Sequence, residues 1–149
     1  MELIFRTVNS NLPSDIEGFN LLMDDLTRRA QDQALLRRNI DEANGNPDKY
    51  LMVAEDAATG TLVGSLLGIC FGDFCEACDP VMVIENVVTR HDFRGRGIAK
   101  AMFEEIEAWG RSKHAAYAIL CSANHRHEAH KFYKAIGYDE VKGFKKYLN

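Results

Sequence analysis

The sequence lacks any hydrophobic run that approaches the roughly 20 residues needed to span a bilayer, so we predict no membrane helix. It also lacks an excess of positive charge, since 18 Lys and Arg stand against 22 Asp and Glu and the net charge is −4 at pH 7. A broad basic surface for nucleic acid is therefore not expected. The first residues contain neither the basic segment nor the long apolar segment of a signal peptide, and we expect a cytoplasmic location.

Cysteine is sparse, with four residues in the chain. An even number could form two disulfides, but without export signals we expect reduced thiols. Cys75 and Cys78 have the spacing of a metal-binding pair, yet no second pair follows, and His125, His127 and His130 lie far away in the sequence. We therefore predict no metal site.

Apolar residues make up 46% of the 149 residues, enough for one ordinary core. No repeat, linker or low-complexity segment divides the chain, and we predict a single domain over residues 1–149. Apolar periodicity predicts strands at residues 3–8, 50–56, 62–71, 81–89, 116–121, 138–141 and 144–148. It predicts helices from about residue 15 to 30, opened by a capping box of Ser14 and Glu17, and at 33–43, 98–112 and 128–136. The sum is an α+β domain with a mixed sheet of about six to seven strands and about four helices.

The stretch from Glu85 to Lys100 carries the clearest chemical signal. A strand with one carboxylate runs into a basic turn with two glycines, and the turn opens directly into a helix. Free backbone N–H groups at a helix start attract an anion such as a pyrophosphate. The candidate donors and cations are Arg90, Arg94, Gly95, Arg96, Gly97, Ile98, Ala99 and Lys100. The alternative is a plain strand-to-helix turn.

Glu85 and Tyr133 are the candidate proton carriers. A carboxylate inside a strand that we expect to be covered on both faces is costly unless it is paired or hydrated. Glu85 is therefore either half of a structural ion pair with an arginine or a base kept ready for reaction. Tyr133, near the end of an amphipathic helix, is either a core aromatic with its hydroxyl at the surface or a proton donor.

Three motifs resemble those of one family. Arg94-x-x-Gly97-x-Ala99 matches Arg/Gln-x-x-Gly-x-Gly/Ala, and residues 84–89 resemble Ile-Glu-Asp-x-x-Val of polyamine and glucosamine-phosphate acetyltransferases, with Asn86 in place of Asp. Residues 129–138 resemble Ala-x-x-Phe-Tyr-x-x-x-Gly-Phe/Tyr. In this order the motifs resemble the GNAT superfamily of N-acetyltransferases, and the C-terminal third is similar to small-amine enzymes such as aminoalkylphosphonate acetyltransferases. The likeness covers residues 3–148 in element order and 81–138 in motifs.

The resemblance implies a mostly antiparallel sheet that holds acetyl-CoA in a cleft between its central strands. It implies transfer of the acetyl group by direct attack of a primary amine, from a small molecule or a protein. Glu85 would be the general base, directly or through a water, and Tyr133 the general acid. The cofactor contacts implied are the turn from Arg94 to Lys100, the backbone of Val87, Val88 and Thr89, and Asn124 or Arg126 from the loop before the last helix.

Two other functions stay open at this point. One is a catalytically idle acyl-CoA-binding or regulatory module on the same fold, although such a module needs neither Glu85 nor Tyr133. The other is a nucleotide-binding protein, although the turn lacks the Gly-Lys-Ser/Thr ending of a P-loop. By analogy with relatives, a homodimer is also conceivable.

Overall fold

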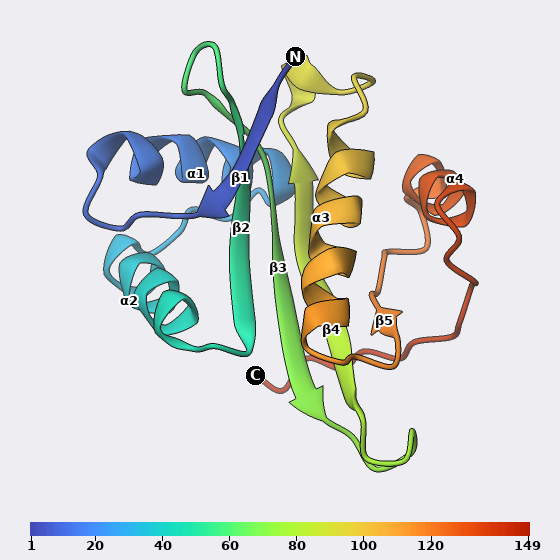
Figure 1. Ribbon diagram of the computed structural model, residues 1–149. Coiled ribbons are helices and arrows are strands. Elements are labelled where there is room, and N and C mark those ends of the chain that lie inside the picture. Colours follow the sequence, from blue (N-terminus) through green and yellow to red (C-terminus); the bar gives the residue numbers. More distant parts are fainter. The chain divides into compact units, whose positions relative to one another are not determined.

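The computed structural model describes all 149 residues and divides into two compact units, Met1–Ile119 and Leu120–Asn149 (Figure 1). The first unit contains a five-stranded sheet and helices α1 to α3, and the second contains helix α4. None of the helices has both the length and the apolar character that a membrane span requires.

The sheet has the strand order β1-β2-β3-β4-β5, in which neighbouring strands are antiparallel except for the parallel pair β4 and β5. This confirms the α+β class and the mixed, mostly antiparallel sheet. The strands are β1 Leu3–Thr7, β2 Lys49–Asp56, β3 Leu62–Gly72, β4 Pro80–Thr89 and β5 Ala118–Ile119. The strands predicted at residues 50–56 and 62–71 are confirmed as β2 and β3, which pair as an antiparallel hairpin.

The predicted number of about six to seven strands is wrong, because residues 138–141 and 144–148 form no strand. Each segment has two adjacent polar residues between its apolar ends, so neither has the strict alternation of a half-buried strand. Residues 139–149 are all exposed, and none of them lies in a helix or strand. The strand predicted at 116–121 is likewise reduced to the two residues of β5.

The four predicted helices are confirmed as α1 Pro13–Leu26, α2 Gln33–Gly45, α3 Ile98–Ser112 and α4 His127–Ala135. The capping box is wrong: Leu12 is the N-cap of α1, and Ser14 lies inside the first turn after Pro13, a residue whose fixed φ suits a helix start. Helix α1 also ends about four residues earlier than predicted. Asp32 then caps α2 by accepting the Leu35 N–H at 3.0 Å.

The two faces of the sheet are covered by different helices (Figure 1). Helices α1 and α2 pack their apolar stripes against Leu51, Val53 and Val88 of the sheet. Helix α3 covers the other face and approaches β3 closely, since a Cβ at Gly68 would lie 2.6 Å from Ile106 Cδ1. The small residues of β3 therefore set the distance between α3 and the sheet.

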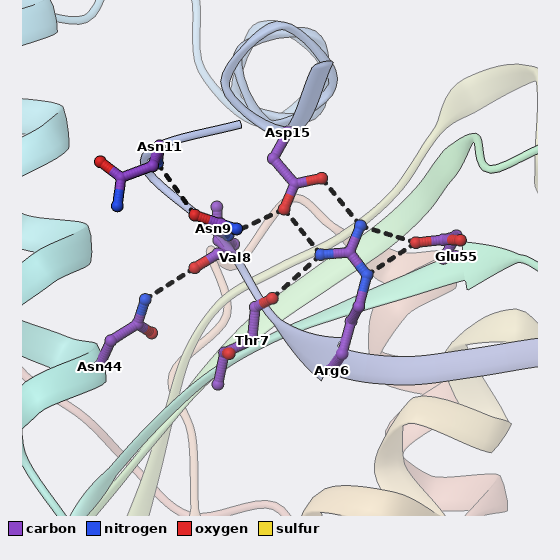
Figure 2. A network of polar contacts seen from close by, with 8 residues as sticks. All are labelled: Arg6, Thr7, Val8, Asn9, Asn11, Asp15, Asn44 and Glu55. Carbon is purple, nitrogen blue, oxygen red and sulfur yellow. Dashed lines mark hydrogen bonds and ion pairs between the residues drawn. The ribbon is translucent and has the colours of Figure 1, made fainter. Parts of the chain in front are cut away.

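A polar network fixes the start of α1 to strands β1 and β2 (Figure 2). The Arg6 guanidinium donates to both oxygens of Asp15, at 2.6 and 2.8 Å, and to Glu55 Oε2 at 2.7 Å. The Asn9 N–H donates to Asp15 Oδ2 at 2.8 Å. Burial of Asp15 alone would raise its pKa, but the hydrogen bonds from Arg6 and Asn9 and the charge of Arg6 hold that pKa below its ordinary value. Asp15 is therefore a buried, paired anion.

Candidate functional site

Strand β4 contains a bulge directly after its one carboxylate residue, Glu85. Glu85 pairs with Leu67 of β3 and Val88 pairs with Ser65, so that Asn86 and Val87 together lie opposite the single residue Leu66. Asn86 takes up the extra length with a φ of +55°, a left-handed conformation that Asn tolerates better than most residues. At the bulge, the two consecutive residues Glu85 and Asn86 are both exposed, which a regular strand with one buried face would not allow.

The outer edge of β4 is open over the same stretch. Within the first unit, β5 pairs only with Met82 and Val83, so no strand pairs with this edge from Ile84 to Thr89. An open strand edge presents backbone N–H and C=O groups to a ligand. The predicted backbone contacts, Val87 to Thr89, lie on this segment.

Glu85 is exposed, which corrects the expectation of a carboxylate buried on both sides of the strand. It shares the sheet face of its partner Leu67, and Leu67 packs against the core beneath α1 and α2. Glu85 takes part in no ion pair, so the alternative of a structural pair with an arginine is also wrong. The bulge explains both results, because it places the carboxylate in water, where it needs no partner.

The glycine turn enters helix α3 through two residues with left-handed backbone conformations. Gly95 and Gly97 have φ values of +77° and +79°, in the left-handed region that favours glycine. The first α-helical hydrogen bond of α3 runs from the Ala101 N–H to Gly97 O at 3.1 Å. The N–H groups of residues 98–100 precede this bond, and no side chain caps them. The helix therefore begins with free donors at the positive end of its dipole.

The arginines of this region make local contacts, while Arg94 and Arg96 remain exposed. Arg90 Nε lies 2.9 Å from Asp92 Oδ1, and Arg94 Nε donates to Thr89 O at 3.2 Å. Arg96 donates to Asp92 O at 3.3 Å, and its guanidinium stacks 4.8 Å from the centre of the Phe93 ring. Arg94 and Arg96 thus place two cations within the turn that leads to the free N–H groups of α3.

The second unit carries the remaining predicted residues. Tyr133 lies on α4, with its ring 5.5 Å from Phe132 and 6.3 Å from Tyr138 between centroids. Burial raises the pKa of the Tyr133 hydroxyl, partly offset by the charge of Arg126, so the hydroxyl keeps its proton at neutral pH. Asn124 and Arg126 are both exposed, and Arg126 is the N-cap of α4.

One contact in the turn region has no local sequence signal. Asp25, at the end of α1, accepts hydrogen bonds from His91, which lies 66 positions later in the chain. Neither residue belongs to a recognisable motif, and only the packing of α1 against β4 brings them together. A covarying pair in an alignment would be the signal that could reveal it.

Comparison with known proteins agrees with this geometry. The sequence model described as "Acetyltransferase (GNAT) family" matches residues 17–138. An aminoglycoside N(6')-acetyltransferase type 1 of Salmonella typhimurium is 26% identical over 86 residues, which span 56% of this chain and 59% of the relative. The chain thus matches less than two thirds of the length of that relative.

Solved structures share the whole fold. Glucosamine-6-phosphate N-acetyltransferase from Arabidopsis thaliana superposes with a TM-score of 0.85 and 21% identity over 100% of both chains. Aminoglycoside N-acetyltransferase AAC(6')-Iy in complex with CoA superposes with a TM-score of 0.81 and 19% identity, over 99% of this chain and 95% of that one. At such identities the likeness shows the fold, whereas the family match extends over most of the sequence. The chain belongs to the acetyltransferase (GNAT) family.

Proposed function

We propose that residues 1–149 act as one domain that transfers an acetyl group from acetyl-CoA to a primary amine by direct attack. One observation carries this proposal: four features follow one another within residues 85–100. They are the bulge of β4, its open edge, the left-handed glycine turn and the uncapped start of α3. Family membership supports the donor, and the solved relative in complex with CoA supports the same cofactor class.

The residues of this region fit acetyl-CoA. The free N–H groups of residues 98–100, with Gly95, Gly97 and the cations Arg94, Arg96 and Lys100, would hold the pyrophosphate. The outer edge of β4 from Val87 to Thr89 would hold the pantetheine arm by backbone hydrogen bonds. When bound, acetyl-CoA supplies the thioester whose acetyl group is transferred. Asn124 or Arg126 would add a further contact to the cofactor.

Glu85 would remove a proton from the acceptor. An amine with a pKa of about 10 is almost fully protonated at neutral pH, and its ammonium form cannot attack a carbonyl carbon. The exposure of Glu85 allows it to accept this proton directly or through a water molecule. A backbone N–H of residues 87–89 would stabilise the negative charge that develops on the carbonyl oxygen.

Tyr133 would return a proton to the leaving thiolate. A tyrosine hydroxyl with its ordinary pKa of about 10 is protonated at neutral pH, and burial raises this pKa further. No step requires a covalent bond to the protein, so no cysteine has a catalytic role in this scheme. The acceptor is a small-molecule or protein amine; aminoglycosides and glucosamine 6-phosphate, named for the relatives, are the first candidates.

A thiol-release assay with acetyl-CoA over a panel of amino sugars, aminoglycosides, polyamines and peptides tests the proposal. Tyr133→Phe should lower kcat by about 10²-fold or more while the Kd of acetyl-CoA stays unchanged, since only the proton donor is removed. Tyr117→Phe, at an exposed tyrosine of the first unit, is the matched control. Unchanged turnover of Tyr133→Phe over a wide pH range would exclude the acid role.

A thermal-shift comparison separates the alternatives. Stabilisation by acetyl-CoA and CoA together with thiol release supports the enzyme. Stabilisation without thiol release for any amine supports an idle acyl-CoA-binding module. Stabilisation by ATP alone would overturn the assignment of the glycine turn.

A further inference from the structure

Asp25 binds the first residue of the segment that leads into the glycine turn. The His91 N–H donates to Asp25 Oδ2 at 2.9 Å, and His91 Nδ1 lies 3.0 Å from Asp25 Oδ1. His91 opens the short 3-10 helix η1, His91–Phe93, which follows directly after β4. A helix start has unsatisfied N–H groups, and here a carboxylate from a different helix accepts one of them.

The Asp25 carboxylate is suited to this contact. Its side chain is 20% exposed, whereas that of His91 is 69% exposed. Partial burial alone would raise the pKa of Asp25, but the hydrogen bonds from His91 and the charges of His91 and Arg94 lower it. Asp25 is therefore ionised at neutral pH and accepts a charge-assisted hydrogen bond.

The segment after His91 is braced within itself, so a constraint at its start extends to its end. The Arg90 N–H donates to Val63 O and the Phe93 N–H to Arg90 O, both at 2.9 Å. Arg96 donates to Asp92 O at 3.3 Å, immediately before Gly97. A shift of His91 would therefore move the residues that lead to the free N–H groups of α3.

Helix α1 is itself fixed at its other end. The Arg6–Asp15–Glu55 network of Figure 2 holds its first turn against β1 and β2. Asp25 lies one residue before the last residue of the same helix. Helix α1 thus connects a rigid anchor in the sheet to the start of the turn segment.

We infer that Asp25 is a positioning residue for the acyl-CoA site, which fixes His91 and thereby the N–H groups that open α3. The inference rests on the proposed function, because the turn is taken to hold the pyrophosphate. Asp25 touches neither substrate in this scheme. Its removal should therefore affect acetyl-CoA affinity and leave the chemical step at saturating acetyl-CoA unchanged.

The test compares Asp25→Ala, Asp25→Asn and the control Asp24→Ala by calorimetric titration with acetyl-CoA and by steady-state kinetics. Asp24 is an exposed carboxylate one residue away on the same helix. Asp25→Ala should raise the Kd and KM for acetyl-CoA roughly fivefold, equal to about 1 kcal/mol, with kcat within about twofold of the wild type. Asp25→Asn should recover most of the affinity, because its amide oxygen still accepts the His91 N–H. Asp24→Ala should bind acetyl-CoA as the wild type does.

Three results would contradict the inference. One is wild-type acetyl-CoA affinity in Asp25→Ala. Another is a loss confined to kcat, which would place Asp25 in the chemistry or the acceptor site. The third is an equal loss of affinity in Asp25→Asn and Asp25→Ala. If Asp25→Ala fails to fold, the Asp25→Asn comparison decides, with the hydrogen-exchange rate of the His91 amide as its second measurement. Failure of the wild type to bind acetyl-CoA would instead refute the proposed function.

Discussion

The buried carboxylate of Asp15 offers the sharpest test of what holds the first unit together. Asp15 is 2% exposed and accepts hydrogen bonds from Arg6 at 2.6 and 2.8 Å and from the Asn9 N–H at 2.8 Å. Asp15→Asn keeps the shape of the side chain but removes its charge and turns an amide NH₂ toward the donors of Arg6. The change therefore leaves the guanidinium with one carboxylate, Glu55, in place of two.

The free energy of unfolding should fall substantially, although the substitution only replaces one carboxylate oxygen with an NH₂ group. Breaking a buried ion pair by removing one partner costs about 3–5 kcal/mol. The Arg6 side chain is 30% exposed and keeps Glu55, which places the expected loss near the lower end, at about 3 kcal/mol. For a chain of this size, about 2–4 °C is lost per kcal/mol, so the midpoint of thermal unfolding should fall by about 6–12 °C.

Urea unfolding followed by fluorescence measures this loss in the first unit alone. The chain has a single tryptophan, Trp109 of α3, whose ring lies 5.9 Å from that of Tyr50 between centroids. Glu104→Gln, which removes an exposed carboxylate 3.7 Å from Lys100, is the matched control and should change stability by less than about 0.5 kcal/mol.

The pH dependence gives the same prediction an independent check. The folded-state pKa of Asp15 is lowered, so the folded protein binds fewer protons than the unfolded chain as pH falls. The stabilisation is complete above the unfolded pKa of about 3.9 and is lost as pH falls below it, through the folded pKa. Asp15→Asn should therefore lose less stability than the wild type below about pH 4. A change under about 1 kcal/mol at neutral pH, or identical acid profiles, would refute this account of the network.

Three further predictions concern packing, the turn and the thiols. Gly68→Ala should destabilise the first unit by about 1–3 kcal/mol, because its Cβ would lie 2.6 Å from Ile106 Cδ1. The control is Gly72→Ala, whose Cβ would have no neighbour within 4 Å and which should have little effect in the same urea titration. In Gly97→Ala the new Cβ would have no neighbour within 4 Å, but alanine would have to adopt a φ of +79°. The free energy of unfolding should therefore fall by about 1–2 kcal/mol, and calorimetry should show weaker acetyl-CoA binding. Unchanged affinity would count against the pyrophosphate assignment. Cys70 is buried, and burial raises its thiol pKa, so mass spectrometry of the alkylated native protein should show it modified more slowly than the other three cysteines.

Local sequence patterns correctly predicted those elements whose structure depends mainly on their own residues. Helix α3 begins and ends as predicted because its apolar stripe and its preceding glycine lie within a few residues of each other. The β2–β3 hairpin follows in the same way from two apolar runs and a short turn that contains glycine. The glycine turn itself could be read from the sequence, because a left-handed φ is a requirement that glycine meets locally.

Predictions that depended on distant partners were the ones that failed. Residues 144–148 are mostly aromatic and apolar at their ends, as is typical of a strand, yet they form none. Ser14 has the spacing of a cap, but the start of α1 follows Pro13 and uses Asp15 to bind Arg6 and Asn9. In both cases the residue types favoured the predicted feature, but residue types alone did not determine which feature formed.

The sequence by itself determined the α+β class, the family motifs and the place of the turn, because each is written in neighbouring residues. Only the tertiary structure decided that Glu85 lies in water, since exposure depends on the register of β4 against β3 and on the bulge between them. It also decided that Asp15 meets Arg6 and that Asp25 meets His91. These contacts join residues from separate elements. They form only when the elements pack together, so no local segment of the sequence determines them.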